Sequence, residues 1–166
     1  MSCPINESAL ASVLKSGSAN AFFNALQVEL CKNFNIKLLT FTQIDMAKCQ
    51  AKRLFSSNDT SYAIGGLKPI EINDWTKQVI KQQQAFIAHK HSDLAKVFFD
   101  HVLIAELGLG SVINWPVIIQ SEVIGTVNLL AEEGAYLHVD LDNLAKLTPW
   151  FSISFLHNLQ LRNDHD

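Results

Sequence analysis

Two asparagines, Asn114 and Asn128, each interrupt an apolar run of strand length. A carboxamide both donates and accepts hydrogen bonds, and a buried amide without partners is costly. A ligand, a water molecule or nearby protein groups must therefore satisfy these two side chains. The runs are joined by a short polar break, Gln120-Ser121-Glu122, which predicts a hairpin. A two-residue turn alone points the amides to opposite faces, whereas an added one-residue bulge brings them to the same face. The sequence leaves both registers open.

Further candidate binding residues precede this hairpin. Tyr62 and Trp75 are aromatic side chains that could stack on a planar ligand or close the core beneath a loop. Asp100 is expected to cap a helix beginning at His101, because adjacent residues on a helix do not face each other as a catalytic pair would. A pocket-lining role for His101 stays open. Lys68 could meet a ligand carboxylate or phosphate, although we expect it to face water.

Several other chemistries lack the residues they need. His89 and His91 alternate on extended backbone, but no third ligand follows nearby, so we expect no metal site. The three cysteines, Cys3, Cys31 and Cys49, form no CxxC pair and no disulfide framework. Neither a nucleophile elbow nor a phosphate-binding loop is present. The sequence therefore assigns no catalytic residue.

Composition indicates a globular domain, and the lack of a disulfide framework favours a reducing cytoplasm. The chain has 166 residues, 48% hydrophobic and 17% charged, with a formal net charge of −3 and no basic run, which argues against nucleic-acid binding. No apolar stretch reaches about 18 residues, so we expect no membrane span, and the N-terminus does not resemble a secretory signal. The low charge content predicts apolar surface that a second subunit buries.

Periodicity supplies the elements that would position these side chains. It predicts helix over 8–34 with a break at 16–18 and Ser18 as N-cap, strands over 36–45 and 51–56, and a long loop over 57–70. A helix from 73 or 74 to 84, a short strand over 85–88 and helices over 94–99 and 101–107 precede the hairpin. A helix from 140 to about 159 follows, kinked at Pro149. Tight turns between strands predict an antiparallel sheet and an α+β fold.

The segment GLGSVINWPVIIQSEVIGTVNLL resembles the characteristic hairpin of GAF domains, a branch of the PAS-like sensor folds. Gly108-Leu109, Ser111, Pro116, Gly125 and Leu129 lie where GAF domains commonly carry a G-L-x-S, P and G-x-x-x-L pattern. YAIGGLKP with Trp75, and FFDHVLIAELGLGS, are also similar to short stand-alone bacterial GAF proteins. The resemblance covers about residues 20–157, with 5–20 as a helical extension of a single domain, 1–166. It implies a central antiparallel sheet of five to six strands, terminal helices on one face and a pocket on the other.

The resemblance implies a cytoplasmic sensor that binds a small organic molecule without catalysis and signals through a partner or a homodimer of its terminal helices. The pocket would be lined by Tyr62, Trp75, His101, Asn114 and Asn128. One alternative is a pure interaction module with a filled pocket. Another is an enzyme similar to the GAF-type free methionine sulfoxide reductases, whose hairpin carboxylates align with Val112, Asn128 and Leu130, none of them acidic. No cyclic-nucleotide pattern and no cysteine suited to a bilin is found, so no cofactor or ligand is named.

Overall fold

A computed structural model describes residues 2–163, which form two compact units. One unit comprises residues up to 34 together with those from 140 onward, and the other comprises residues 35–139. No helix of the described residues is long and apolar enough to cross a membrane. The expectation that 1–166 is a single domain with its terminal helices on one face of the sheet stays a prediction.

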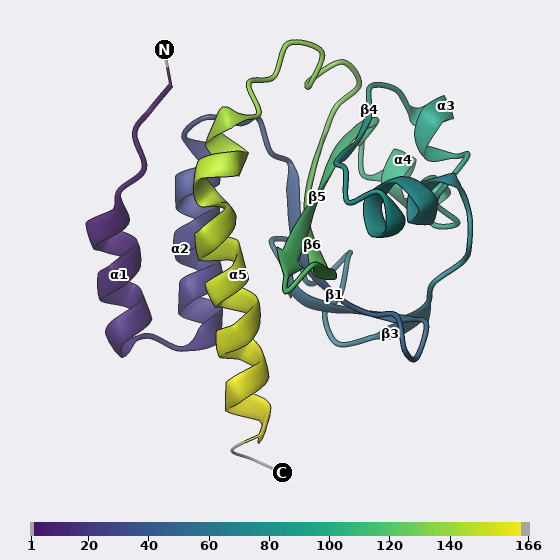
Figure 1. The fold of residues 1–166 in the computed structure, drawn as a ribbon. Coiled ribbons are helices and arrows are strands. Elements are labelled where there is room, and N and C mark those ends of the chain that lie inside the picture. Colours follow the sequence, from purple (N-terminus) through teal and green to yellow (C-terminus); the bar gives the residue numbers. More distant parts are fainter. Residues whose placement is uncertain (1, 164–166) are drawn as a thin grey trace. The chain divides into compact units, whose positions relative to one another are not determined.

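The first unit consists of three helices, α1 (Glu7–Ser16), α2 (Ala19–Cys31) and α5 (Asp142–Asn163), drawn in purple and yellow in Figure 1. The Ser18 hydroxyl accepts a hydrogen bond of 3.1 Å from the Ala21 backbone N–H, which confirms the predicted N-cap of α2. The rings of Phe22 on α2 and Trp150 on α5 lie 6.4 Å apart between centroids. Aromatic packing thus joins the first and last long helices of the sequence.

The second unit is built on a six-stranded sheet in the order β3-β2-β1-β6-β5-β4. The strands are β1 (Leu38–Asp45), β2 (Gln50–Ser56), β3 (Leu67–Pro69), β4 (Phe86–Ala88), β5 (Ser111–Ile119) and β6 (Glu122–Ala131). All neighbouring pairs are antiparallel, which confirms the predicted sheet and α+β class. One correction concerns 57–70, expected to be loop throughout: its end forms edge strand β3 beside β2. Pro69 is compatible with an edge position, where a missing N–H breaks no central ladder.

The β5–β6 hairpin contains both features that the sequence left open. Gln120 and Ser121 form a two-residue turn with φ of 52° and 65°, the left-handed backbone that tight hairpins favour. The register then shifts by one residue, because Ile118 pairs with Val123 while Val117 pairs with Gly125. Ile124 is the extra residue of this bulge. Asn114 consequently lies directly opposite Asn128, on the same face of the sheet.

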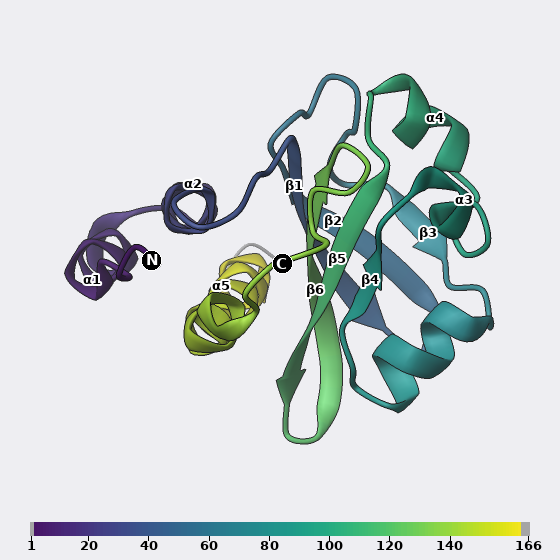
Figure 2. The ribbon, with the colours of Figure 1, turned by 90° about the horizontal axis from the view of Figure 1, so that it is seen from above.

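Short helices lie beside the sheet in the second unit. They are a π-helix, η1 (Thr76–Lys81), and two helices, α3 (His91–Leu94) and α4 (His101–Glu106), and Figure 2 shows them all on one side of the strands. Two predicted helices differ from those observed. The helix expected to run to residue 84 is the shorter η1, and Asn73 Oδ1, two residues before Trp75, accepts a hydrogen bond of 3.0 Å from Thr76 N. The helix expected over 94–99 is wrong: α3 ends at Leu94, and the turns that follow place Phe98 against the rings of Trp75 and Phe86.

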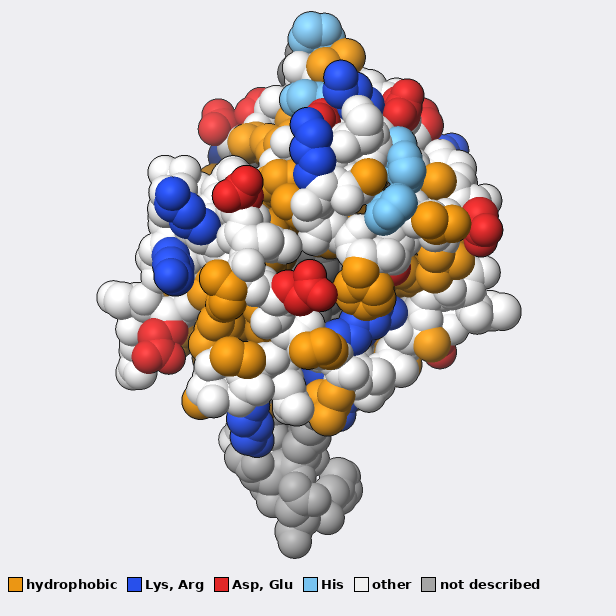
Figure 3. Space-filling model, turned by 90° about the vertical axis from the view of Figure 1, so that its right-hand side faces the viewer, with side chains coloured by type: hydrophobic (Ala, Val, Ile, Leu, Met, Phe, Trp, Pro, Cys, Tyr) orange, Lys and Arg blue, Asp and Glu red, His pale blue; other side chains and the backbone are white. Residues whose placement is uncertain are grey.

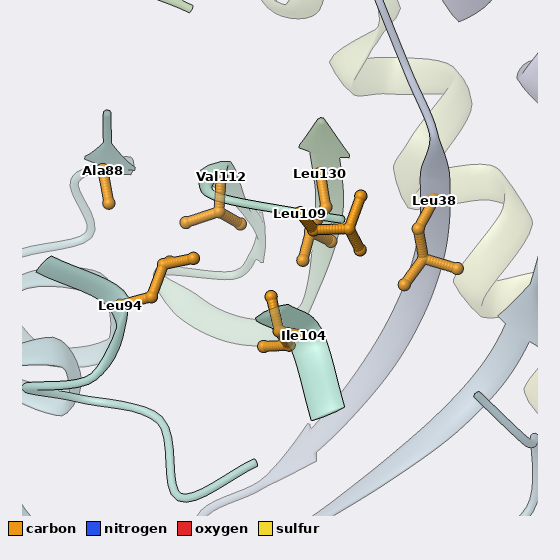
Figure 4. Close-up of a cluster of buried hydrophobic side chains, with 7 residues drawn as sticks. All are labelled: Leu38, Ala88, Leu94, Ile104, Leu109, Val112 and Leu130. Atoms are coloured by element: carbon orange, nitrogen blue, oxygen red, sulfur yellow. The ribbon is translucent and has the colours of Figure 1, made fainter. Parts of the chain in front are cut away.

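A buried hydrophobic cluster joins α3 and α4 to the strands. Figure 4 shows Leu94 of α3 and Ile104 of α4 directed toward Val112 of β5 and Leu130 of β6. Each of these four side chains is at most 4% exposed. Burying a leucine or isoleucine side chain contributes roughly 1.5–3 kcal/mol. The cluster therefore anchors the segment between β4 and β5 against the sheet.

Candidate ligand-binding cavity

A cavity of about 170 Å³ lies within the second unit, between the sheet and the segments that connect its strands. Its floor is formed by alternate residues of β1, β2, β5 and β6, and its walls by segments 62–75 and 97–104. The lining side chains include Thr40, Thr42, Arg53, Tyr62, Lys68, Trp75, Phe98, Phe99, Asp100, Asn114 and Asn128. Cavities of about 150 Å³ hold benzene, so this one has room for a molecule built on a single ring or a short branched chain.

A chain of hydrogen bonds crosses the cavity floor from η1 to β1. Trp75 Nε1 donates to Asn114 Oδ1 at 2.9 Å, and Asn114 Nδ2 donates to Asn128 Oδ1 at 2.7 Å. Asn128 Nδ2 then donates to the hydroxyls of Thr40 and Thr42, at 3.0 and 3.2 Å. Asn114 and Asn128 are 4% and 9% exposed, so water does not replace these bonds. The two amides therefore satisfy each other.

The direction of this chain follows from its first member. An indole N–H can only donate, so Asn114 must present its oxygen to Trp75 and its nitrogen to Asn128. Asn128 in turn presents its nitrogen to the threonines. The threonine oxygens accept these bonds, which leaves their hydroxyl protons to donate elsewhere. The floor can thus offer hydroxyl donors to an acceptor atom on a ligand.

One corner of the cavity is charged. The Tyr62 hydroxyl donates to Asp100 Oδ2 at 2.5 Å, and Lys68 Nζ lies 3.6 Å from the same oxygen. Burial, followed by the neighbouring Asp100 carboxylate, raises the pKa of the Tyr62 phenol well above its usual range. Asp100 occupies the N-cap position of α4, but its side chain makes no capping bond. The predicted capping role of Asp100 is therefore wrong, because its carboxylate is engaged by Tyr62 instead.

Arg53 lies on β2 beside this corner and directly opposite Thr42 of β1. Its guanidinium carbon is 3.6 Å from the centroid of the Tyr62 ring, a cation–π contact. Its Nη1 donates to the Ala63 carbonyl oxygen at 2.6 Å. Its Nε is buried without a hydrogen-bond partner. The guanidinium is thus held in position by a ring face and a carbonyl, with one edge unused.

Four of the five predicted site residues line the cavity together: Tyr62, Trp75, Asn114 and Asn128. His101 is not among the lining residues. Its backbone oxygen contacts His91 Nε2 at 2.8 Å, and the two imidazole rings lie 5.4 Å apart. Consecutive residues at the start of a helix point about 100° apart, so Asp100 lines the cavity while His101 faces His91. Ligand binding by the four lining residues stays a prediction.

Sequence reasoning missed Arg53 and misjudged Lys68, which was expected to face water. Lys68 lines the cavity, since β3 pairs with β2 and carries it there. A signal for Arg53 was available: it alternates with Ala51 along β2 and so shares a sheet face with Ala51. A signal for the bulge was also available, because Gly125 interrupts an apolar strand.

Metal and thiol chemistry find no support in this cavity. Across residues 2–163, no group of three or more histidine, cysteine, aspartate or glutamate side chains could hold a metal ion. Cys3, Cys31 and Cys49 are all exposed, and none of them lines the cavity.

Hydrophobic side chains remain exposed around the cavity. Figure 3 views the right-hand side of Figure 1 and shows hydrophobic groups gathered between acidic and basic ones. Large hydrophobic side chains exposed on the segments near the cavity are Ile64, Leu67, Ile72, Phe99 and Val102. Of these five side chains, Phe99 also lines the cavity.

Comparison with solved structures shows that the chain has the GAF fold, as the hairpin predicted. The GAF domain of an Acinetobacter phosphoenolpyruvate-protein phosphotransferase has a TM-score of 0.70 and 11% identity, with 94% of each chain covered. The GAF domain of a two-component sensor histidine kinase from Bacillus halodurans has a TM-score of 0.64 and 16% identity, over 87% of this chain and 95% of the other. A type II free methionine-R-sulfoxide reductase from Thermoplasma acidophilum has a TM-score of 0.59 and 15% identity, over 86% of this chain and 93% of the other. No family model and no curated protein matches the chain.

Proposed function

We propose that this chain is a regulatory domain that binds a small organic molecule in the cavity and does not catalyse a reaction. The observation that carries the proposal is the directed hydrogen-bond chain from Trp75 through Asn114 and Asn128, which lies in the floor of a cavity with room for a ligand. Small-molecule sites are typically apolar cavities with a few polar groups that orient the ligand. The sensor kinase that shares the fold is consistent with a regulatory role.

A ligand shifts a conformational equilibrium only if it binds one conformation more tightly than another. The wall segment that carries Tyr62 and Lys68 contributes only one strand to the sheet, β3, which has three residues and lies at the sheet edge. We propose that a ligand orders this segment. The change would then reach a partner protein or a second copy of the chain.

A homodimer is the simplest receiver of such a signal. Val28 on α2 and Leu156 on α5 are 60% and 49% exposed, and apolar helix surface of this kind favours a protein contact. Light scattering after size exclusion tests this: we expect a dimer that Val28→Glu or Leu156→Glu converts to monomer. A monomeric parent protein would contradict the homodimer.

The ligand itself is tested by native mass spectrometry of the protein purified from its source organism. We expect an additional mass that is released on denaturation, and we expect Asn128→Leu to lose it. Asn24→Leu, at an exposed position of α2, is the matched control and should retain the mass. Retention of the mass by Asn128→Leu would assign that amide a purely structural role.

A second candidate is an interaction module whose cavity stays empty of ligand. It is favoured by one observation, namely that Asn114 and Asn128 already satisfy each other without a ligand. No additional mass in the native protein, together with no thermal stabilisation by a metabolite panel, would support this candidate against the sensor.

An enzyme similar to the sulfoxide reductase is the weaker alternative. Val112, Asn128 and Leu130, the positions aligned with carboxylates of that family, all line the cavity, and none is acidic. The absence of any cysteine among the lining residues argues in the same direction.

A further inference from the structure

The unused edge of Arg53 is the feature of the cavity that points to a class of ligand. Among the described residues, Arg53 takes part in no ion pair, and its hydrogen bond goes from Nη1 to the Ala63 carbonyl oxygen. Its Nε is buried and lacks a partner. A buried charged donor without an acceptor is unfavourable, so an acceptor supplied from the cavity would stabilise the protein.

The geometry of this guanidinium suits a carboxylate. The Tyr62 ring stacks on one face and the bond to Ala63 occupies Nη1, whereas Nε, which shares its edge with Nη2, has no hydrogen-bond partner. Two parallel N–H groups on one edge match the two oxygens of a carboxylate in a bidentate pair. Because stacking already holds the guanidinium in place, little side-chain freedom is lost when the pair forms.

A second cation reaches the same corner. Lys68 Nζ lies 5.5 Å from the Tyr62 ring centroid and 5.1 Å from the Phe99 ring centroid. Its carboxylate partner, Asp100, also accepts the Tyr62 hydroxyl. Arg53 and Lys68, which both contact the Tyr62 ring, thus share this corner with one partly buried carboxylate, Asp100, because the other acidic lining residue, Glu71, is exposed to water. An added negative charge would balance this corner.

We propose that the cavity binds a small monocarboxylate, an inference that rests on the proposed function. Its carboxylate pairs with the free edge of Arg53 and is attracted by Lys68. Its apolar body lies against Trp75 and Phe98, and the volume limits that body to about one six-membered ring or a branched chain of similar size. The threonine hydroxyls of the floor can donate to any further oxygen that the ligand carries.

Matched pairs of acids and amides test the charge without changing the shape. We would titrate benzoate against benzamide, and 3-methylbutanoate against 3-methylbutanamide, and follow the indole N–H resonance of Trp75, assigned with Trp75→Phe. We expect each acid to bind on the order of tenfold tighter than its amide, the scale of a charge-assisted hydrogen-bond pair. Raising the salt concentration should reduce this preference.

Two neighbouring variants on β2 provide the control. Arg53→Gln should abolish the preference for acids, whereas Lys52→Gln removes the same charge at a residue that does not line the cavity and should leave the preference unchanged. The comparison of acid with amide in the parent protein stands even if Arg53→Gln does not fold.

The outcomes separate this inference from the proposed function. Equal binding of acids and amides, tighter binding of inorganic phosphate, or release of a neutral molecule from the native protein would overturn the monocarboxylate while retaining a ligand-binding domain. Release of a carboxylic acid would support it. No binding by any probe and no released mass would overturn both.

Discussion

The bond between the two floor amides can be tested by replacing both with leucine, which has a similar size but no hydrogen-bonding atoms. In Asn128→Leu, Asn114 Nδ2 loses the acceptor that lies 2.7 Å away, at a residue only 4% exposed. An unsatisfied buried donor costs about 1–3 kcal/mol. We therefore expect the free energy of unfolding to fall by an amount in that range.

In Asn114→Leu, two groups lose their partner: the Trp75 indole N–H and Asn128 Oδ1. Water can replace the lost partner of the half-buried Trp75 more readily than that of Asn128. We therefore expect the free energy of unfolding to fall by about 2–4 kcal/mol, with Asn128 Oδ1 as the larger cause. In the double variant the bond between the amides is absent from both sides. Each single variant loses the free energy of this bond, whereas the double variant loses it only once.

The single losses should therefore sum to more than the loss in the double variant, by about 1–2 kcal/mol. Urea unfolding followed by circular dichroism gives the four free energies, with midpoint and slope fitted together. Asn24→Leu combined with Asn114→Leu is the control, because Asn24 lies exposed on α2 and should add to within about 0.5 kcal/mol. If the amide pair were additive to the same degree, the reasoning about the cavity floor would be refuted.

Three further predictions concern stability. Because burial and Asp100 raise the folded pKa of Tyr62, the contribution of Tyr62 to the free energy of unfolding is fully present below its unfolded pKa of about 10 and is lost as the pH rises above that value. Urea midpoints from pH 8 to 11 should therefore fall less in Tyr62→Phe than in the parent. Glu29, 5% exposed, accepts from a backbone N–H at residue 6 at 3.0 Å, so Glu29→Ala should cost about 1–3 kcal/mol by urea unfolding, and a loss under 0.5 kcal/mol would contradict this. A Cβ on Gly110 would lie 2.1 Å from Glu133 Cγ, whereas one on Gly66 would meet nothing within 4 Å. Thermal melting should show Gly110→Ala destabilised by about 1–3 kcal/mol and Gly66→Ala almost unchanged; equal melting of the two would argue against that close approach.

Much of the fold could be predicted because its determinants are local. The N-cap bond of Ser18 spans three residues, and strand alternation repeats every two, so both act within a short window of sequence. The β-branched runs around Gln120-Ser121 likewise predicted the central hairpin and, with it, the GAF fold that comparison then showed. The predicted helix over 94–99 was wrong because aromatic contacts to distant segments outweighed local periodicity.

The candidate site could be predicted only in part. The amides could be recognised because a polar side chain is unexpected within an apolar strand. The aromatic residues could be recognised because their rings can stack on a ligand. Strand alternation assigns Arg53 to the sheet face of Ala51, but neither it nor the sequence around Lys68 shows whether these cations meet a cavity or solvent. The positions of both side chains depend on which strands pair, and no short sequence pattern predicts the pairing of β3 with β2.

The sequence by itself determined the kinds of groups available to this protein: two amides in apolar strands, aromatic side chains before them, and no thiol or metal cluster at useful spacing. Tertiary structure alone decided how they combine. A single bulge residue, Ile124, sets whether Asn114 and Asn128 share a face, since a shift of one position reverses every side chain beyond it. The partner of Asp100 is Tyr62, 38 residues away, rather than the helix end beside it. Such choices rest on which polar groups packing brings within about 3 Å, and that distance is a property of the folded chain.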